Sequence, residues 1–257
     1  MKENTNFIGK NNSTACWNKV DKELVDYNSR QYDEMYRSTS FIIKNLSKKI
    51  KSSECLNILD VGCGGGANLF HIANYFKNCS FTGIDVNEYF INFAQKKYLQ
   101  NKVNNVDLFV HNIFSDSLID NKNKKYDIVG SSQVVSFLNF DLSTKAFHRY
   151  FKLSKKGVYF QSLFTDYLLD YEINIYDHKY EKIVPYNIYS ISRVSNIAKE
   201  YGFALNMQSK FMIDVDLENN SLNRGTRTVK KENKERMMFS GDMHLPWQFL
   251  YFEKVIK

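Results

Sequence analysis

Short apolar runs alternate with amphipathic stretches between residues 56 and 164. The runs are LNILDV (56–61), SFTGID (80–85), VDLFV (106–110), YDIVGSS (126–132) and KGVYFQSL (156–163). In the intervals 67–76 and 87–99, apolar side chains recur at the three- and four-residue spacing of a helix that buries one face. Strands that alternate with helices predict a mainly parallel sheet covered by helices on both faces.

The two ends of the chain follow other patterns. Residues 18–51 have apolar positions at helical spacing, which predicts a helical segment before the first strand. After residue 164 the alternation is lost, and 165–189 is aromatic and acidic without a clear period. Residues 190–203 predict a helix that stops at Gly202, and 204–215 and 247–256 predict two late strands separated by a polar, basic connection. Two strands after one helix suit an antiparallel addition to the sheet.

Composition narrows the class of protein. Hydrophobic residues make up 43% of the 257 residues, which is typical of a globular chain, and the net charge of +7 mildly favours anionic partners. No pair among Cys16, Cys55, Cys63 and Cys79 has CxxC spacing, so they read as reduced thiols of a cytoplasmic protein. No apolar stretch has the length of a signal-peptide core or of a membrane span, so we expect no membrane partner.

The segment DVGCGGG (60–66) follows the first predicted strand and precedes a helix. Such a turn brings a ligand close to the backbone and to the positive end of the helix. The absence of GK[ST] excludes a P-loop. A dinucleotide site, and hence an NAD-dependent oxidoreductase, fits Gly62, Gly64, Ala67 and Asp85. However, Asp60 would repel a pyrophosphate and suits a ligand with an ammonium group. The long helical lead-in also differs from dinucleotide domains, which more often open on the glycine strand.

These motifs resemble those of class I S-adenosylmethionine-dependent methyltransferases. DVGCGGG matches their first motif, and Asp85 in FTGIDVN matches the acidic residue that ends the next strand. HNI (111–113) stands at their third motif, and the fourth follows the strand in YDIVGSSQVVSFL. The likeness covers roughly residues 35–165. It implies a Rossmann-like, seven-stranded, mainly parallel sheet with helices on both faces, an antiparallel last strand, N-terminal helices and substrate-site insertions.

The resemblance also implies a cofactor site for S-adenosyl-L-methionine. The backbone of 62–66 and Asp60 are expected to hold the methionine end, and Asp85 the two ribose hydroxyls. Adenine is expected at Asn112 and Ile113, although many members have an aspartate at this third motif. Arg37 is a candidate partner for the cofactor carboxylate, with a solvated helix arginine as the alternative. The full set of predicted cofactor residues is Asp60, Gly62, Cys63, Gly64, Asp85, Val86, Asn112, Ile113, Ser131, Gln133 and Arg37.

The acceptor must be inferred from the last third of the chain. Aromatic rings stack on sugars, and guanidinium groups match phosphates. On this basis we predict a substrate site formed by Tyr186, Tyr189, Arg224, Arg227 and Trp247, although ordinary surface arginines are an equal alternative. The ending ERMMFSGDMHLPWQFLYFEK also resembles that of methyltransferases associated with bacterial surface-polysaccharide synthesis. That resemblance implies O-methylation of a nucleotide-activated sugar, for example a GDP-linked heptose, for capsule or lipopolysaccharide.

A sugar hydroxyl needs a general base, because it is a poor nucleophile until it loses its proton. His244, His178 and Asp166 are the candidates, since all three fall in the predicted substrate half. His71 and His148 are expected to be structural. Asp166, Asp170 and Asp177 more plausibly form a solvated acidic loop than a metal site, so no metal is expected.

The prediction is therefore a cytoplasmic S-adenosylmethionine-dependent O-methyltransferase with a small-molecule substrate. Residues 1–55 form a helical segment that caps the cofactor site. Residues 56–257 form the methyltransferase domain, with insertions at about 165–190 and 214–248. Nucleic acid is an unlikely partner, because the motif [DN]-P-P-[FYW] is absent and the fourth motif reads SSQV. Methylation of another small molecule or of nucleic acid, the oxidoreductase, and a non-catalytic partner subunit are the alternatives, and the oligomeric state is not predicted.

Overall fold

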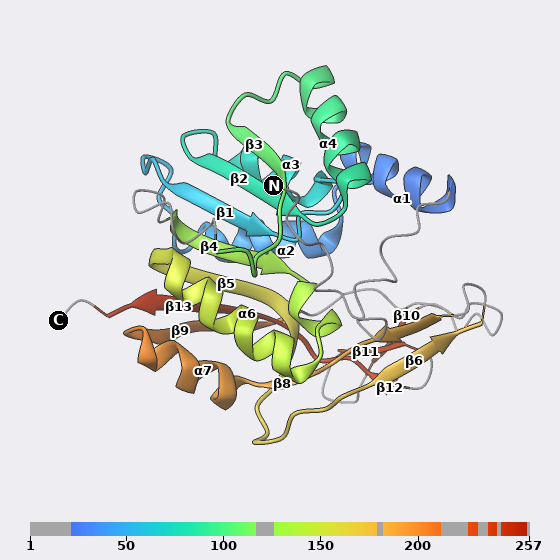
Figure 1. Ribbon diagram of the computed structural model, residues 1–257, viewed down its shortest axis with the longest axis vertical. Helices are drawn as coiled ribbons and strands as arrows, with labels where there is room; N and C mark the ends of the chain where they lie inside the picture. Colours follow the sequence, from blue (N-terminus) through green and yellow to red (C-terminus); the bar gives the residue numbers. More distant parts are fainter. Residues whose placement is uncertain are drawn as a thin grey trace.

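The computed structural model describes residues 22–116, 126–178, 182–211, 226–230, 236–240 and 243–255. Its main sheet runs in the order β3-β2-β1-β4-β5-β13-β9 (Figure 1), and the two-residue strand β8 (Tyr189–Ser190) pairs with β5 off this path. The path strands are β1 (Asn57–Val61), β2 (Ser80–Asp85), β3 (Val106–Val110), β4 (Tyr126–Ser132), β5 (Ser154–Thr165), β9 (Phe203–Lys210) and β13 (Trp247–Lys254).

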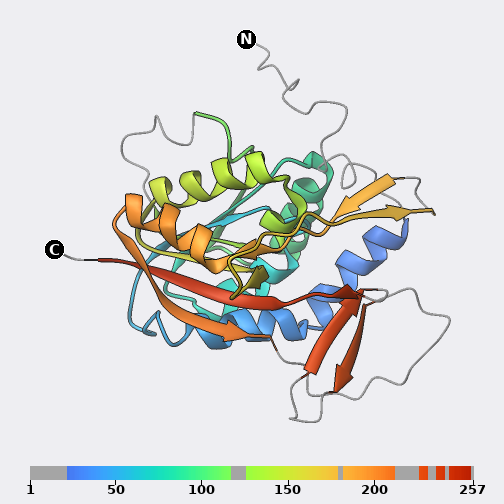
Figure 2. The ribbon, with the colours of Figure 1, turned by 90° about the horizontal axis from the view of Figure 1, so that it is seen from below.

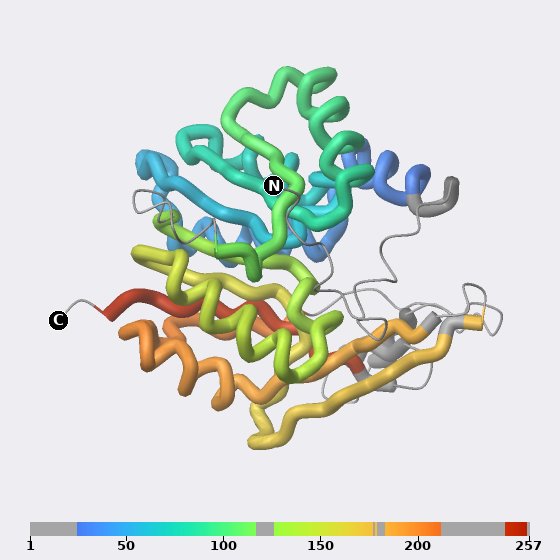
Figure 3. The backbone as a smooth tube through the Cα atoms, viewed as in Figure 1, coloured from blue at the N-terminus to red at the C-terminus, as the bar shows by residue number. Residues whose placement is uncertain are grey.

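Strand β13 supplies the antiparallel element of the sheet. It runs between β5 and β9 and is antiparallel to both, whereas β1, β2, β3, β4 and β5 are mutually parallel. The backbone path in Figure 3 shows this red strand in the middle of the lower half of the sheet. The predicted fold class, a mainly parallel Rossmann-like sheet with an antiparallel last strand, is confirmed.

Helices cover both faces of the sheet, as the view in Figure 2 shows. On one face α6 (Phe140–Leu153) and α7 (Ile191–Glu200) share a buried cluster with Leu59, Val129 and Phe160. On the other face α2 (Arg37–Leu46), α3 (Ala67–Tyr75) and α4 (Glu88–Gln100) pack on Ile58 and Ile128. Because consecutive strand residues point to opposite faces, Ile58 and Leu59 join different clusters.

The N-terminal segment, whose pattern is helical over 18–51, contains two helices in the described residues. Helix α1 (Lys22–Asp33) ends before Tyr36, whose extended backbone (φ −67°, ψ 150°) is the N-cap of α2. Neither Gly nor Pro marks this break, so the local sequence gave no signal for it. The break turns the chain so that α1 and α2 both contact α3.

Two small sheets lie in the predicted insertions. In the first, β6 (Asn174–Asp177) and β7 (Lys182–Pro185) form an antiparallel pair. In the second, β10 (Thr226–Lys230), β11 (Arg236–Ser240) and β12 (Met243–His244) form a three-stranded antiparallel sheet. The polar connection predicted after residue 215 was therefore partly wrong, because its residues 226–230 pair with 236–240. Within the described residues, no helix is long and apolar enough to cross a membrane.

Candidate cofactor and acceptor pocket

The glycine turn connects β1 to α3 through three residues in the left-handed backbone region. Gly62, Gly64 and Gly66 have φ values of +71°, +53° and +79°, which glycine adopts without steric cost. The turn is also tightly packed, since a Cβ on Gly62 would lie 2.2 Å from Cγ2 of Val134. A Cβ on Gly64 would meet nothing within 4 Å. Gly64 therefore faces open space, where a ligand can approach the backbone.

Neighbouring elements hold this turn in place. The amides of Gly62 and Cys63 donate to the carbonyl of Ile84 at 2.7 and 3.0 Å. The hydroxyl of Tyr32 in α1 donates to the carbonyl of Gly65 at 2.5 Å, and that of Tyr98 in α4 donates to Gly66 at 2.8 Å. Two helices far apart in the sequence thus fix successive carbonyls of the turn, and Ala67 and Asn68 at the start of α3 line the cavity.

Asp85, at the end of β2, is bonded to the turn and to its own loop. One carboxylate oxygen accepts from the amide of Gly64 at 2.8 Å, and the other accepts from the amide of Asn87 at 2.9 Å. Burial raises the pKa of Asp85, and the bonds from Asn87 and Gly64 oppose this rise. Both hydrogen bonds orient the carboxylate beside the cavity, which suits a group that accepts bonds from ligand hydroxyls.

Asp60 lies on β1 beneath the turn and does not line the cavity. It is 5% exposed, and its Oδ1 faces the hydroxyl of Tyr159 at 3.5 Å. Burial raises the pKa of Asp60 to about 7, with a smaller upward contribution from Asp85, while the Tyr159 hydroxyl opposes the rise. A carboxyl in this position gains a favourable partner when a cationic ligand group enters above it.

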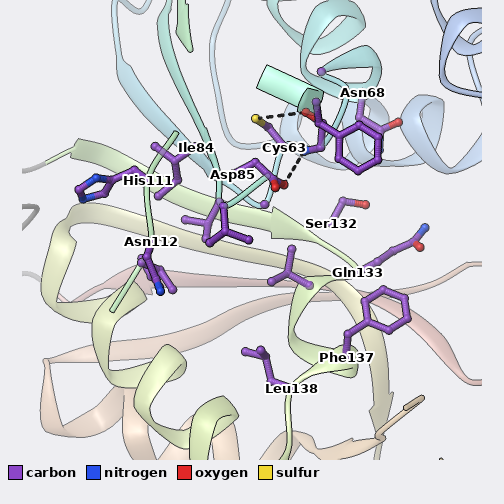
Figure 4. A pocket seen from close by; sticks show the side chains of 18 of the residues that line it. Cys63, Asn68, Ile84, Asp85, His111, Asn112, Ser132, Gln133, Phe137 and Leu138 are labelled. Carbon is purple, nitrogen blue, oxygen red and sulfur yellow. Dashed lines mark hydrogen bonds between the residues drawn. The ribbon is translucent and has the colours of Figure 1, made fainter. Parts of the chain in front are cut away.

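The cavity has a volume of about 730 Å³, within the range of small-molecule sites. Figure 4 shows His111 and Asn112 on one side of it, and Asn68, Ser132, Gln133 and Phe137 on the opposite side. Next to the Asn112 side, α6 contributes four basic lining residues. They are Lys145, His148, Arg149 and Lys152. The cofactor-sized cavity thus has two chemically different ends.

Eight of the eleven predicted cofactor residues line this cavity. They are Gly62, Cys63, Gly64, Asp85, Val86, Asn112, Ile113 and Gln133. The side-chain oxygen of Asn112 accepts from the amide of Phe114 at 3.0 Å, which shapes the loop after β3. Gln133 has a φ of +69°, rare for a residue with a side chain, and its amide donates to the carbonyl of Gln161 at 2.7 Å. Such backbone strain is typical of functional sites.

The other three predicted cofactor residues lie outside the lining. Asp60 is beneath the turn, as described above. Ser131 is buried on β4, and the next residue, Ser132, lines the cavity instead. Arg37 is exposed at the start of α2, whereas its neighbours Tyr36 and Ser38 line the cavity. Neighbouring residues of a strand or helix point in different directions, which explains why Ser132 lines the cavity and Ser131 does not, and why Tyr36 and Ser38 line it and Arg37 does not.

The predicted substrate residues are dispersed. Tyr189 is fully buried and donates to the carbonyl of Leu138 at 2.6 Å, and Trp247 packs in a satellite core with Leu163. Tyr186 packs its ring on Phe137, which lines the cavity. Arg227 is on β10, but its side chain lies outside the described part of the structure, as does all of Arg224.

Among the candidate bases, His178 and Asp166 lie away from the cavity lining. His178 follows β6 and contacts the ring of Tyr176, and Asp166 accepts from Gln208 at 2.7 Å. His244 belongs to β12, and its side chain is not described. Asp170, one of the acidic loop residues, pairs with Arg193 at 2.6 Å. Within the described residues, no cluster of three or more His, Cys, Asp or Glu side chains would hold a metal ion.

Several lining residues were not predicted from the sequence. Tyr27, Asn28, Gln31, Tyr36 and Ser38 come from α1 and the start of α2, about a hundred residues before Gln133. Their sequence carries no motif. The sequence predicted a helical N-terminal segment that caps the cofactor site, but it did not indicate which side chains of that segment line the cavity.

Comparison with known proteins supports the motif assignment. Residues 59–160 match the model of a methyltransferase domain family. The chain is 35% identical over 94 residues to the release factor glutamine methyltransferase of Fusobacterium nucleatum subsp. nucleatum, covering 37% of this chain and 26% of that protein. It is 31% identical over 117 residues to a putative methyltransferase of Invertebrate iridescent virus 6, covering 46% and 37%. The chain thus spans well under half the length of these relatives.

Solved structures share the fold. Magnesium protoporphyrin IX methyltransferase from Synechocystis, with bound S-adenosylmethionine, has a TM-score of 0.56 at 11% identity and covers 94% of this chain and 89% of its own. An S-adenosylmethionine-dependent methyltransferase from Aquifex aeolicus has a TM-score of 0.52 at 16% identity and covers 93% and 100%. The glycine turn, Asp85 and these matches agree. Residues 59–160 therefore match a methyltransferase domain, and the chain has the fold of these solved methyltransferases.

Proposed function

We propose that this protein transfers the methyl group of S-adenosylmethionine to a sugar hydroxyl of a small molecule, such as a nucleotide-activated sugar. The observation that carries the proposal is the lining of the cavity opposite Asn112. Figure 4 places the amide side chains of Asn68 and Gln133 and the hydroxyl of Ser132 there, and the lining also includes the amides of Asn28 and Gln31 and the hydroxyl of Ser38. Amides and hydroxyls both donate and accept hydrogen bonds, as sugar hydroxyls do.

The cofactor would lie between the two ends of the cavity. Gly64 and the start of α3 would hold the methionine end, Asp85 the ribose and the Asn112 loop the adenine. This arrangement would direct the sulfonium methyl toward Gln133 and the amide-lined end. The chain's main contribution to the rate would be to align the acceptor oxygen, methyl carbon and sulfur for in-line displacement.

The acceptor oxygen must lose a proton as its bond to the methyl carbon forms and the sulfur–methyl bond breaks. We propose His244 as the base. The carbonyl of Pro246, two residues later, accepts from the amide of Phe164 at 3.1 Å, which fixes this stretch beside the end of β5. His178 and Asp166 lie outside the cavity lining, whereas the side chain of His244 is outside the described part of the structure. Replacing His244 by Gln should lower kcat and remove a pH dependence near neutrality, with the affinity for S-adenosylhomocysteine unchanged.

The decisive experiment has two stages. Calorimetry with S-adenosylhomocysteine should show binding to the wild type and a loss of at least about tenfold in Asp85→Ala, because two or more charge-assisted bonds are lost. Methyl transfer is then assayed on nucleotide-activated sugars, free amines and RNA. Equal binding by both proteins would overturn the Asp85 role, and transfer only to amines or RNA would overturn the sugar acceptor.

A further inference from the structure

Aromatic rings converge on the end of the cavity opposite Asn112. Tyr27 in α1, Tyr36 at the N-cap of α2 and Phe137 in the 3-10 helix η3 (Val134–Phe137) line it, and Tyr186 packs behind Phe137. The rings of Tyr27 and Tyr36 are 5.7 Å apart at 69°, and those of Phe137 and Tyr186 are 5.4 Å apart at 68°. Three segments distant in the sequence therefore build one aromatic wall.

Polar contacts join the two halves of this wall. Burial raises the pKa of the Tyr27 hydroxyl, and the neighbouring Tyr36 and Tyr186 add to this rise. The α1 helix is itself held over the glycine turn, because Tyr32 bonds to Gly65 and the carbonyl of Gln31 contacts Nε2 of His71 at 2.7 Å. The position of the wall is thus fixed relative to the cofactor site.

The exposure of Tyr27 distinguishes it from core tyrosines. It leaves 43% of its surface exposed although its ring borders the cavity, whereas Tyr150, Tyr159 and Tyr189 are at most 1% exposed. A large aromatic face that is open toward a cavity is available to a ligand. The uncharged amides beside it leave hydrogen bonding to hydroxyls as the second mode of recognition.

A cyclic sugar satisfies both modes at once. One face of a pyranose ring carries C–H groups that pack on the electron-rich face of an aromatic ring. The hydroxyls at its edge then meet the amide side chains. An open-chain polyol has the hydroxyls but lacks the rigid apolar face, and it also loses conformational entropy on binding.

We propose that Tyr27 and Tyr36 determine acceptor specificity by stacking on the face of a cyclic sugar, an inference that rests on the proposed function. They are binding residues supplied by the N-terminal helices. The acceptor site is therefore shared between residues 22–38, η3 and the insertion that carries Tyr186. Their role is to bind the sugar ring, and they take no part in the methyl-transfer step.

The test compares two kinds of nucleotide-activated acceptor. A set of nucleotide-activated hexopyranoses and the acyclic CDP-ribitol are assayed for formation of S-adenosylhomocysteine, with free nucleotides as blanks. The wild type should methylate at least one hexopyranose and prefer it to CDP-ribitol. Tyr27→Ala and Tyr36→Ala should each raise KM about five- to tenfold, as expected for loss of one stacked ring. Tyr27→Phe should retain most of the affinity, because it keeps the ring.

Matched controls separate this role from folding and from cofactor binding. Tyr75→Ala removes an exposed tyrosine at the end of α3, away from the cavity, and should leave KM unchanged. Calorimetry with S-adenosylhomocysteine should give equal affinities for all variants. If the wild type prefers CDP-ribitol, transfers methyl to no hexopyranose, or keeps its KM in both alanine variants, the stacking proposal is overturned. Absent binding of S-adenosylhomocysteine to the wild type would instead overturn the proposed function.

Discussion

At Gly64 a substitution is expected to affect binding of the cofactor more than folding of the protein. An alanine there would keep a left-handed φ of +53°, which costs about 1 kcal/mol, and its Cβ would meet no protein atom within 4 Å. The methyl group would enter the cavity where the methionine end of the cofactor is expected. We predict that Gly64→Ala folds with a similar midpoint in urea but binds S-adenosylhomocysteine at least tenfold more weakly by calorimetry.

Gly66→Ala is the matched control for that prediction. A Cβ at Gly66 would lie 2.9 Å from both the Cβ of Ala94 and the hydroxyl of Tyr32. This substitution should therefore lower the urea midpoint itself. If Gly64→Ala binds S-adenosylhomocysteine as tightly as the wild type, the cofactor does not approach the backbone at this residue.

Asp60 should make the stability of the ligand-free protein depend on pH. Its pKa in the folded state is about 7 because it is buried, whereas the ordinary pKa of an aspartate, which applies in the unfolded chain, is 3.8. Between these values the folded state holds a proton that the unfolded state has lost, so stability falls as pH rises from about 4 through 7. Asp60→Asn should remove this dependence and be more stable at pH 8, by up to a few kcal/mol at ~1.4 kcal/mol per unit of pKa.

Urea titrations at pH 5, 6, 7 and 8 measure this effect. The slope of unfolding free energy against pH should be more negative in the wild type than in Asp60→Asn. Equal slopes would show that the carboxyl keeps an ordinary pKa. Asp166→Asn serves as the control, because Asp166 is exposed at the surface.

At the scale of elements, β4 must lack a side chain where the ring of Tyr159 crosses it. Asp60, Gly130 and Tyr159 are neighbours in register across β1, β4 and β5. A Cβ on Gly130 would lie 1.9 Å from Cε1 of Tyr159. The glycine thus lets the tyrosine reach the carboxylate two strands away, while its ring stacks on Phe249 of β13 at 5.9 Å.

We predict that Gly130→Ala destabilises the protein by about 1–3 kcal/mol, the range for overpacking in a core, although alanine is ordinarily better than glycine in a strand. Combining it with Tyr159→Leu should recover part of the loss, because the ring that clashes is gone. A double-mutant cycle by urea unfolding measures this coupling. A coupling near zero would mean that the strands shift to accept the methyl group.

The elements that the sequence predicted well are those specified by local pattern. The runs at 57–61, 80–85 and 126–132 are buried strands because their apolar side chains pack on both faces, and Gly202 ends its helix region with a φ of +72°. The pairing of 226–230 with 236–240 was not predicted, since TRTVK (226–230) has a single hydrophobic residue and gives no strand pattern of its own. The prediction of Tyr189 and Trp247 as substrate-binding residues rested on their aromatic side chains. Both side chains are buried in the core, and an aromatic residue type does not by itself distinguish a core residue from a ligand-binding one.

At the scale of the whole molecule, the cofactor site depends on contacts that no local pattern predicts. Tyr32 and Tyr98 come from helices on either side of the glycine turn, yet their hydroxyls bond to consecutive carbonyls. The acceptor end likewise joins Tyr36 to Phe137 across about a hundred residues. The motifs predicted where the cofactor binds, whereas these long-range contacts decide how rigidly it is held and what faces it.

Ligand binding should therefore order the N-terminal helices together with the turn. We predict that saturating S-adenosylhomocysteine slows backbone hydrogen exchange in residues 25–33 as well as in 62–68, because Tyr32 connects the two segments. In Tyr32→Phe, which loses the bond to Gly65 and keeps the ring, protection should persist at 62–68 and decrease at 25–33. The affinity should fall about three- to tenfold, as expected for one hydrogen bond.

Tyr98→Phe provides the comparison for this coupling, because it removes the bond to Gly66 from the α4 side. It should weaken binding to a similar degree while leaving the ligand-induced protection of residues 25–33 in place. Ligand-induced protection confined to 62–68 in the wild type would show that α1 is fixed independently of the cofactor. In that case the N-terminal helices would shape the acceptor end without responding to the cofactor, and acceptor and cofactor would bind in either order with equal affinity.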